Sequence, residues 1–403
     1  MKYIIVLGDG MADVPVAALG GKTPLEAASH PCADALAAQG MLGMVRTVPE
    51  GMPPGSDAAN MSVLGYAPEK YYSGRSPLEA VSLGVKLQDD DVAVRCNLVT
   101  LTGAAALEDN CMGDYSCGEI ETEESRQLIL ALKEQLDSDR CTLYPGISYR
   151  HCLVLHHTKL GTVLTPPHDI SGKSVRGCLP QGINGDFLRE YMEASRKILA
   201  GHPVNAARRA AQRPTADCCW FWGEGTRPKF DSFQSLYGLK AGMVCAVDLL
   251  KGLALCAGME VPFVLGATGG KRTDFAAKGR AALQLLESGC DLVYIHIEAP
   301  DESGHAGDTA CKIEAIEKID SEIIRFLTDA LHARSEDFRL LFTPDHPTPL
   351  HLKTHTGNPV PFLLFDSRRP LSPSALRYTE AEAAKTGVFL GEGPLLMQLL
   401  LER

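Results

Sequence analysis

Several features that define common protein classes are missing from this sequence. Its 403 residues contain no uninterrupted apolar run approaching the ~18 residues of a membrane-spanning helix. The apolar run Ile4-Ile5-Val6-Leu7 is too short for a secretory signal. The 13 cysteines form no Cys-x-x-Cys pair, and their odd number and irregular spacing argue against a disulfide scaffold. We therefore expect a protein of the reducing cytoplasm.

The sequence also lacks an excess of basic charge. Lys and Arg total 39 against 50 for Asp and Glu, which gives a net charge of −11. This balance argues against a protein that coats nucleic acid or binds an anionic membrane, although a local basic pocket for a small anion remains compatible with it. Walker A and Gly-x-Gly-x-x-Gly patterns are absent, so no motif indicates nucleotide binding. The sequence leaves the oligomeric state open.

What is present is an alternation of short apolar strands with helices in the first and last parts of the chain. This alternation predicts an α/β fold with a mostly parallel sheet and helices on both faces. The expected strands are residues 3–7, 43–48, 261–265, 291–297, 339–343 and 361–365. The expected helices are residues 31–39, 56–64, 275–286 and 309–331.

The middle of the chain breaks this alternation and predicts a separate, smaller α+β cap domain. We place this insertion at residues 106–215, which leaves a discontinuous core of residues 1–105 and 216–403. Within the insertion we expect a helix at 121–136, a strand at 149–155 and a loop at 166–169. Arg208, Arg209 and Arg213 are interpreted as an exposed linker next to Pro214.

Polar side chains follow the predicted strands at several points. Asp9 stands between two glycines after the first strand, and Asp345 and His346 directly follow another. Asp301 and His305 are four residues apart, a spacing that lets both side chains meet one ion on a helical segment. Because ligands of open α/β sheets bind outside the carboxyl ends of the strands, we expect these residues to converge.

Ser56 begins the predicted helix that follows Pro54-Gly55. A serine at a helix N-terminus meets free N–H groups and partial positive charge, which suits a nucleophile that carries phosphate, although a simple capping serine is the commoner case. With His355, the candidates comprise three carboxylates, three imidazoles and one hydroxyl. Such a set suits two Mn²⁺ or Zn²⁺ ions better than Ca²⁺. A hydrolytic Ser-His-Asp triad is the competing interpretation, but the Gly-x-Ser-x-Gly pattern is absent.

Taken in order, these motifs resemble those of the cofactor-independent phosphoglycerate mutases of the archaeal type, in the alkaline phosphatase superfamily. The resemblance runs almost from end to end. The motifs that carry it are Asp9-Gly10, Pro54-Gly55-Ser56-Asp57, Tyr71-Tyr72-x-Gly74-Arg75, Pro145-Gly146-x-Ser148-Tyr149-Arg150-His151, Pro300-Asp301-x-x-Gly304-His305, Pro344-Asp345-His346 and His355-Thr356-x-x-Pro359-Val360-Pro361.

The resemblance implies an activity and a division of roles. It implies that Ser56 takes phosphate from the substrate and returns it to another hydroxyl, interconverting 3-phosphoglycerate and 2-phosphoglycerate without bisphosphoglycerate. One divalent ion would be held by Asp301, His305 and His355, and the other by Asp9, Asp345, His346 and the Ser56 hydroxyl. Mn²⁺ and Zn²⁺ are the expected ions, with Mg²⁺ a further candidate. The cap would close over a small phosphorylated hydroxy acid and exclude water.

Basic residues are the candidates for contact with that anionic substrate. The arginine fork bonds both oxygens of a carboxylate or phosphate. A surface salt bridge is the alternative role for each candidate. The candidates are Arg75, Arg95 and Arg150 with His151 beside them, and Lys271 or Lys278 from the core.

One segment departs from the family pattern. Where that pattern has the basic stretch Asp-Arg-Arg-Ala-Gly-Arg, residues 114–119 read Asp-Tyr-Ser-Cys-Gly-Glu. A bacterial branch with this character has been proposed to phosphorylate homoserine, so a homoserine kinase-like phosphotransferase is the main alternative function. A phosphatase on the same scaffold and a non-catalytic metal-binding module are the others. The last is disfavoured because every candidate ligand and the nucleophile are present.

Overall fold

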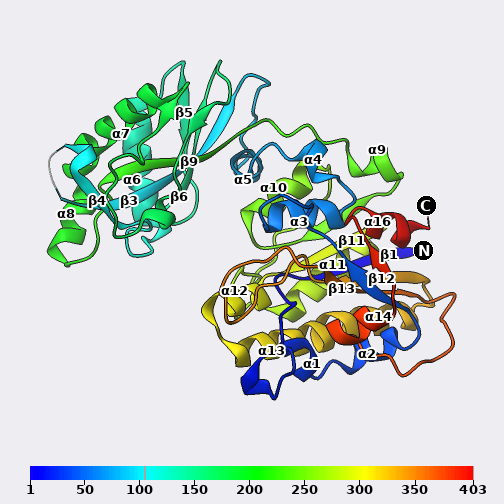
Figure 1. Cartoon of the computed structure of the whole chain (residues 1–403). Helices are drawn as coiled ribbons and strands as arrows, with labels where there is room; N and C mark the ends of the chain where they lie inside the picture. The colour runs from blue at the N-terminus through cyan, green and yellow to red at the C-terminus, as the bar shows by residue number, and fades with distance from the viewer. Residues whose placement is uncertain (104–105, 403) are drawn as a thin grey trace. The chain divides into compact units, whose positions relative to one another are not determined.

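The computed structural model describes residues 1–103 and 106–402, and the chain divides into two compact units. The first, here called the core unit, comprises Met1–Tyr72 and Lys229–Arg403. The second, here called the inserted unit, is Ser73–Pro228, the cyan-to-green part of Figure 1. The predicted insertion at 106–215 lies inside it, and its predicted start adjoins residues 104–105, which lie outside the described residues.

The core unit is built on a seven-stranded sheet in the order β10-β11-β1-β12-β13-β2-β14. Only β13 runs antiparallel to its neighbours β12 and β2. The strands are β1 (Lys2–Gly8), β2 (Met41–Val45), β10 (Ala241–Val244), β11 (Leu292–Ile297), β12 (Phe338–Thr343), β13 (Val360–Asp366) and β14 (Phe389–Leu390).

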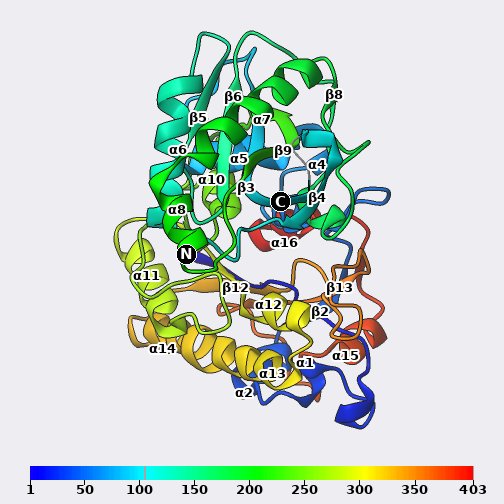
Figure 2. The ribbon, with the colours of Figure 1, turned by 90° about the vertical axis from the view of Figure 1, so that its left-hand side faces the viewer.

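Helices cover both faces of this sheet. Alternate residues of a strand point to opposite faces, and Ile4 and Val6 of β1 pack into the core beneath the sheet. The helices on that face are α1 (Pro24–Ala27), α2 (Pro31–Ala37), α11 (Phe275–Glu287), α13 (Thr309–Lys318), α14 (Arg325–Ala333) and α15 (Glu380–Lys385). The other face carries α3 (Ser56–Val63), α10 (Asp248–Cys256) and α16 (Leu395–Leu401). Figures 1 and 2 both show α13 and α14 along the lower side of the strands. The predicted fold class, a mostly parallel sheet with helices on both faces, is confirmed.

Two predicted elements of the core unit differ from the structure. Residues 261–265 form a loop, in which the side chains of Phe263 and Leu265 are 91% and 83% exposed, so the predicted strand is wrong. A short apolar segment interrupted by Pro262 does not by itself define a strand, and the edge position is taken by β10. The predicted helix 309–331 is present as α13 and α14, joined by a π-helical turn at Ile319–Ile324.

The inserted unit has its own five-stranded antiparallel sheet, in which the long strand β3 pairs with β4, β6 and β9. Its strands are β3 (Val92–Gly103), β4 (Asn110–Asp114), β5 (Cys141–Tyr144), β6 (Arg150–Leu155) and β9 (Cys218–Thr226). Its helices are α5 (Arg75–Ser82), α6 (Thr122–Leu136), α7 (Gly185–Ala200) and α8 (Pro203–Ala210). Because β3 is the strand on which α5, β6 and β9 assemble, the unit begins before and ends after the predicted boundaries.

Arg208, Arg209 and Arg213 were expected to form an exposed linker. Arg209 and Arg213 are exposed, but Arg208 is not. Arg208 lies on α8 and is 1% exposed. Its guanidinium donates to the carbonyl oxygens of Pro214 and Cys117 and forms an ion pair with Glu124 of α6. These acceptors satisfy the buried charge, so Arg208 holds the inserted unit together. The predicted loop at 166–169 contains the 3₁₀ turn Pro167–Ile170.

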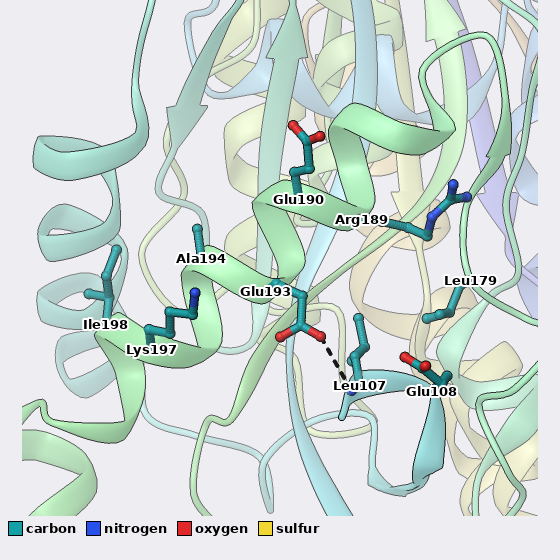
Figure 3. A pocket seen from close by; sticks show the side chains of 9 residues that line it. All are labelled: Leu107, Glu108, Leu179, Arg189, Glu190, Glu193, Ala194, Lys197 and Ile198. Atoms are coloured by element: carbon teal, nitrogen blue, oxygen red, sulfur yellow. Dashed lines mark hydrogen bonds between the residues drawn. The ribbon is translucent and has the colours of Figure 1, made fainter. Parts of the chain in front are cut away.

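A groove of about 590 Å³ opens on the inserted unit beside α7 (Figure 3). The apolar side chains of Leu107, Leu179 and Ile198 line it together with charged groups of α7. Its described lining contains no histidine, serine or cysteine. Among the described helices, none combines the length and apolar character needed to cross a bilayer.

Candidate metal centre

The sequence-predicted carboxylates and imidazoles of the core unit converge at the carboxyl ends of three neighbouring strands. β1 pairs with both β11 and β12, with Leu7 opposite His296 and Thr343, so the three strands end level with one another. Asp9 follows β1, and Asp345 and His346 follow β12. The chain leaves β11 directly into α12 (Ala299–Ala306), whose first turn carries Asp301. The side chains are brought together by the topology of the sheet.

One potential ligand group consists of Asp9, Asp345 and His346, whose ligand atoms lie within 4.8 Å of one another. His346 Nε2 is 3.6 Å from Asp9 Oδ1 and 3.4 Å from Asp345 Oδ2. The hydroxyl of Ser56, the first residue of α3, lies 3.1 Å from the same nitrogen. The hydroxyl therefore adjoins this group from the N-terminus of a helix.

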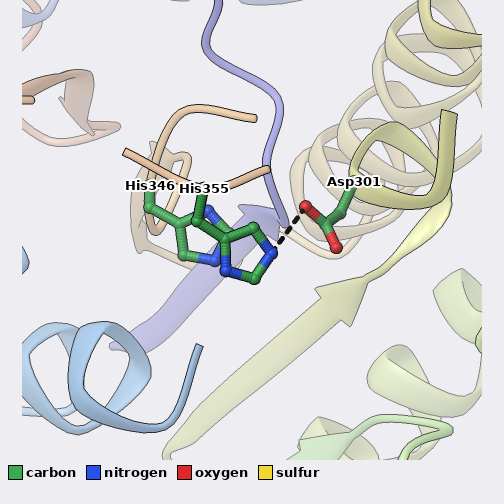
Figure 4. Close-up of side chains that lie close together, drawn as sticks. All are labelled: Asp301, His346 and His355. Atoms are coloured by element: carbon green, nitrogen blue, oxygen red, sulfur yellow. Dashed lines mark ion pairs between the residues drawn. The ribbon is translucent and has the colours of Figure 1, made fainter. Parts of the chain in front are cut away.

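A second group of the same kind consists of Asp301, His346 and His355 (Figure 4). The imidazoles of His346 and His355 are stacked with their centroids 4.0 Å apart, and His355 Nε2 is 3.3 Å from Asp301 Oδ1. His305 Nε2 completes this edge, 3.2 Å from Asp301 Oδ2 and 2.9 Å from His355 Nε2. The expected division of ligands gave His346 to one ion only, whereas the geometry places it between both groups.

Hydrogen bonds to backbone carbonyls fix the orientation of two of these imidazoles. His305 Nδ1 lies 3.0 Å from the carbonyl oxygen of Lys353, and His355 Nδ1 lies 3.2 Å from that of Pro54. A carbonyl oxygen only accepts, so each Nδ1 carries the hydrogen, and each Nε2 is the nitrogen left to bind an ion once its own proton is displaced. This is the arrangement in which histidine binds a metal ion.

The Asp345 carboxylate is oriented by donors from three segments. Gly10 N and His346 N donate to Oδ1, and the Asn60 side chain donates to Oδ2 at 2.9 Å. Asn60 lies one turn after Ser56 on α3 and also donates to the Ser56 carbonyl oxygen. Sequence reasoning gave Asn60 no role, although its position four residues after Ser56 placed both on one face of the helix.

Gly10 is required by both its backbone angle and its surroundings. Its φ is +59°, and a Cβ atom there would collide with the Asp301 carboxylate and the Thr348 hydroxyl. The Thr348 hydroxyl donates to Asp301 Oδ1. The close approach of the segment after β1 to α12 thus depends on the missing side chain.

The electrostatics of the site call for a cation. Burial, together with the nearby Asp345 and Asp301 carboxylates, raises the pKa of Asp9 well above its usual value. Asp9 Oδ1 is buried without a hydrogen-bond partner in the described structure, yet it faces the His346 lone pair. Three neighbouring carboxylates with imidazole nitrogens aimed at them are a mixed oxygen and nitrogen donor set that fits Mn²⁺ or Zn²⁺. The residues present therefore fit the expected divalent ions.

Neighbouring carboxylates also shift the pKa values of the imidazoles of His305 and His355. A hydrogen bond to Asp301 raises the pKa of His305 to about 9. Burial opposes ionisation of His355, but its hydrogen bond to Asp301 raises the pKa above the usual value. Burial lowers the pKa of His346, which keeps that imidazole neutral and able to donate its lone pair.

The predicted arginine contacts lie on the inserted unit. Arg75 and Arg95 both contact the Glu79 carboxylate, with each Nε atom 2.9 Å from one of its oxygens. The Arg95 guanidinium also stacks 4.0 Å from the centroid of the Trp222 ring. Burial lowers the pKa of Arg95 to about 10, so this arginine keeps its positive charge at neutral pH. Arg150, at the start of β6, is exposed and packs on Tyr149.

His151 does not join these arginines. It pairs with Cys96 across the β3–β6 ladder, whereas Arg95 pairs with the next residue, Cys152. Successive residues of a strand point to opposite faces, so His151 and Arg95 leave opposite faces of the sheet. His151 is 4% exposed and its Nδ1 accepts a hydrogen bond from Gly146 N. We therefore leave His151 out of the substrate contacts proposed below.

The two predicted lysines of the core unit also differ from one another. Lys271 is partly exposed and lies 3.1 Å from Asp308, the N-cap of α13. Lys278 is 0% exposed, and its ammonium group donates to Glu298 and to the His296 carbonyl oxygen. A fully buried ammonium with these partners does not reach a substrate. We assign Lys278 a structural role in place of the predicted substrate contact.

The fold and this centre define a class: an α/β protein with a buried carboxylate–imidazole centre at the ends of its parallel strands and a serine at a helix N-terminus against it. Sequence and structure comparisons then identify the family. The family model of 2,3-bisphosphoglycerate-independent phosphoglycerate mutase matches residues 37–205. A relative from Geobacter sulfurreducens, named a probable 2,3-bisphosphoglycerate-independent phosphoglycerate mutase, is 46% identical over 403 residues, the full length of both chains.

Other relatives agree. The 2,3-bisphosphoglycerate-independent phosphoglycerate mutase of Methanosarcina mazei is 46% identical over 96% of each chain. The solved structure of the PH0037 protein from Pyrococcus horikoshii has a TM-score of 0.82 and 29% identity, covering 100% of this chain and 96% of that one. The cofactor-independent phosphoglycerate mutase of Thermoplasma acidophilum has a TM-score of 0.68 and 25% identity, covering 100% and 99%. The chain belongs to the family of 2,3-bisphosphoglycerate-independent phosphoglycerate mutases.

Proposed function

We propose that this protein interconverts 3-phosphoglycerate and 2-phosphoglycerate without bisphosphoglycerate, by two-metal phosphoryl transfer through a phosphoserine at Ser56. The observation that carries the proposal is the Ser56 hydroxyl at 3.1 Å from His346, against a centre of three carboxylates and three imidazoles. Family membership supplies the substrate, since the relatives are named for this reaction.

Two divalent ions at this centre would lower the pKa of a bound hydroxyl and neutralise charge on a transferring phosphoryl group. The residues that would hold them are Asp9, Asp301, Asp345, His305, His346 and His355, with the Ser56 hydroxyl. Three carboxylates and neutral imidazoles carry three negative charges, so two divalent ions would leave the centre positive toward an anionic substrate.

Ser56 performs both halves of the reaction. In the first, its Oγ loses its proton and attacks phosphorus, the bond from phosphorus to the 3-oxygen of the substrate breaks, and that oxygen takes a proton. In the second, the 2-hydroxyl of the retained glycerate loses its proton and attacks phosphorus, the bond from phosphorus to Oγ breaks, and Oγ takes a proton. The free N–H groups at the start of α3 favour the negative charge that Ser56 then carries.

The inserted unit is proposed to hold the rest of the substrate. Arg75, Arg95 and Arg150 are proposed to contact the substrate, because the planar guanidinium bonds both oxygens of a carboxylate or phosphate. The Glu79 and Trp222 contacts fix the Arg95 guanidinium in advance of binding. Lys271 is the proposed contact from the core unit. Exclusion of water by the inserted unit would separate a mutase from a phosphatase.

The test is an enolase-coupled assay on metal-stripped protein, with Mn²⁺, Zn²⁺ or Mg²⁺ restored singly and bisphosphoglycerate omitted. The proposal predicts metal-dependent formation of 2-phosphoglycerate from 3-phosphoglycerate at enzymatic rates, and the effective ion identifies the metal. Release of inorganic phosphate in place of 2-phosphoglycerate would establish a phosphatase instead.

The sequence of residues 114–119 is the reason to test homoserine as a second phosphate acceptor. In this turn the Asp114 carboxylate accepts from Ser116 N and Gly118 N, and Tyr115 packs edge-on against Tyr149, where the family pattern has arginines. A less basic surface suits a less anionic substrate such as homoserine. If metal-loaded protein leaves 3-phosphoglycerate unchanged but forms phosphohomoserine from homoserine and a phosphate donor, the mutase proposal is overturned in favour of the kinase.

A further inference from the structure

A buried chain of charged groups leads from α11 to the proposed metal centre. Lys278 Nζ lies 2.6 Å from Glu298 Oε2, and Glu298 Oε1 lies 3.2 Å from His296 Nδ1. His296 Nε2 then lies 3.3 Å from Asp9 Oδ2. Lys278 and His296 are 0% exposed, Glu298 3% and Asp9 5%. Three buried ionisable side chains thus lead to one proposed metal ligand.

The geometry fixes what His296 does in this chain. Its Nδ1 is 3.2 Å from Glu298 Oε1 and its Nε2 is 3.3 Å from Asp9 Oδ2, so the buried ring lies between the two carboxylates. The contact with His296 is made by Asp9 Oδ2, and the other oxygen, Oδ1, is directed toward His346. The Lys278 ammonium donates to Glu298 and so fixes the carboxylate on the far side of the His296 ring.

One face of β11 supports both carboxylates of the first ligand group. Tyr294 and His296 are two residues apart and therefore point to the same face. The Tyr294 hydroxyl donates to Asn60 Oδ1, and Asn60 donates to Asp345. His296 contacts Asp9 directly. The two carboxylates are thus oriented by alternate residues of a strand that supplies no ligand itself.

We propose that His296 is a positioning residue, held by Glu298 and Lys278, that aims Asp9 Oδ1 at the ion shared with Asp345 and His346. This inference rests on the proposed function, since it assumes that Asp9 binds metal. It assigns Lys278 and Glu298 a purpose in the core unit that is independent of substrate. It also predicts that the ion held by Asp301, His305 and His355 does not depend on His296.

The test measures Mn²⁺ binding to the metal-stripped full chain by titration calorimetry and by the electron paramagnetic resonance signal of bound Mn²⁺. Wild-type protein should bind two ions. His296→Leu should bind one ion with unchanged affinity and the other about 10–100-fold more weakly, the usual effect of losing a residue that orients a ligand. His296→Gln, which keeps one donor toward Asp9, should recover part of the loss. Thermal unfolding and circular dichroism show that each variant is folded.

His30→Leu is the matched control. His30 is also a buried imidazole of the core unit paired with a carboxylate, 3.1 Å from Asp34, but it contacts none of the proposed ligands. This control should bind both ions as wild type does. A double variant gives a further check: in an Asp9→Asn background, His296→Leu should cause no additional loss of affinity, because His296 acts through Asp9.

The outcomes separate this inference from the function on which it rests. If wild-type protein binds two ions and His296→Leu binds both equally well, the positioning role is wrong and the proposed function stands. Equal losses in His296→Leu and His30→Leu would likewise overturn the inference, because they would show a general effect of removing a buried imidazole. If wild-type protein binds no second ion, the two-metal mechanism of the proposed function is wrong, and the inference that rests on it falls with it.

Discussion

At the scale of single residues, Ser56 combines three properties that a phosphate-carrying nucleophile needs. Its hydroxyl lies on the first residue of a helix, it is partly accessible, and it is 3.1 Å from an imidazole of the proposed metal centre. Ser62 lies on the same helix and is buried, with its hydroxyl unpaired in the described structure. Replacing each serine in turn therefore distinguishes loss of the hydroxyl at the metal centre from loss of any serine hydroxyl on this helix.

Ser56→Ala should lower mutase turnover by at least about 10⁴-fold, because removing a covalent nucleophile leaves only binding and electrostatic catalysis. The Mn²⁺ affinity should fall far less than turnover, because the carboxylates and imidazoles that would hold the ions remain, and the unfolding temperature should change little. Ser62→Ala, the control on the same helix, should keep most of the activity. Turnover of Ser56→Ala at the wild-type rate would rule out the phosphoserine.

His151 predicts an acid-sensitive contribution to stability in the inserted unit. Burial lowers its pKa to about 3, below the usual value of 6.5, so folding favours the neutral ring. The cost of keeping it neutral is absent above pH 6.5 and grows as the pH falls, by roughly 1.4 kcal/mol per pH unit. Urea unfolding at pH 7.5, 5.5 and 4.5 should show a steeper acid loss for wild type than for His151→Gln. Parallel curves for the two proteins would contradict the assignment.

The residue types of the centre were predictable from the sequence, but their partners were not. Asp9, Asp301 and Asp345 follow apolar strands, where a carboxylate is costly to bury unless it is paired or binds a cation. Nothing in the spacing indicates that His346 stacks on His355 and stands between both ligand groups. His296 was visible as one of a cluster of histidines, yet its contact with Asp9 depends on which face of β11 it occupies.

At the scale of secondary-structure elements, α12 must lie close to the segment that follows β12. Gly304 makes this approach possible: a Cβ atom there would be 2.5 Å from the Thr348 carbonyl oxygen and 2.7 Å from Thr348 Cγ2. The helix carries Asp301 and His305, so any displacement of α12 moves both from the centre.

Gly304→Ala should therefore weaken Mn²⁺ binding at the ion shared by Asp301 and His355 by about tenfold or more. It should also destabilise the core unit by about 1–3 kcal/mol, the usual cost of overpacking. Titration calorimetry and urea unfolding measure the two effects. Gly391→Ala is the control, since a Cβ atom there meets nothing within 4 Å. Unchanged binding in Gly304→Ala would show that the α12 contact does not set the ligand positions.

Elements with strong local signals were predicted, and those defined by long-range pairing were not. The helix at 56–64 and the strands around Asp9 and Asp345 carry apolar runs bounded by glycine or proline. β3 and β9 were missed because their mixed sequences become strands through pairing with each other across more than a hundred residues. The predicted strand at 261–265 had the apolar residues but no partner in the sheet.

At the scale of the whole molecule, the chain forms two units with separate cores. Core residues of the inserted unit pack around β3 and α7, and those of the core unit around β1 and β11. The interruption of the strand–helix alternation predicted an insertion, but not that α5 and β3 belong to it. Composition cannot show this, because the mixed sequence of β3 becomes a strand of this unit only through its pairing with β6 and β9.

Removal of metal should destabilise the core unit specifically. Ions that bind only the folded centre add stability with concentration, about 2.7 kcal/mol at a free concentration 100 times the dissociation constant. Chelation should therefore lower the unfolding temperature of the core unit, and Mn²⁺ should restore it. The inserted unit, which carries none of the proposed ligands, should be unaffected when its unfolding is followed through Trp220 and Trp222. Equal shifts in both units would contradict the placement of the ions.

The phosphoserine is the most direct test of the mechanism as a whole. Mn²⁺-loaded wild-type protein would be mixed with 3-phosphoglycerate in the absence of bisphosphoglycerate, quenched in acid within one turnover, and mapped by peptide mass spectrometry. We predict phosphate on the peptide that contains Ser56, together with 2-phosphoglycerate in solution. Formation of 2-phosphoglycerate with Ser56 unmodified at every time point would contradict the proposed mechanism.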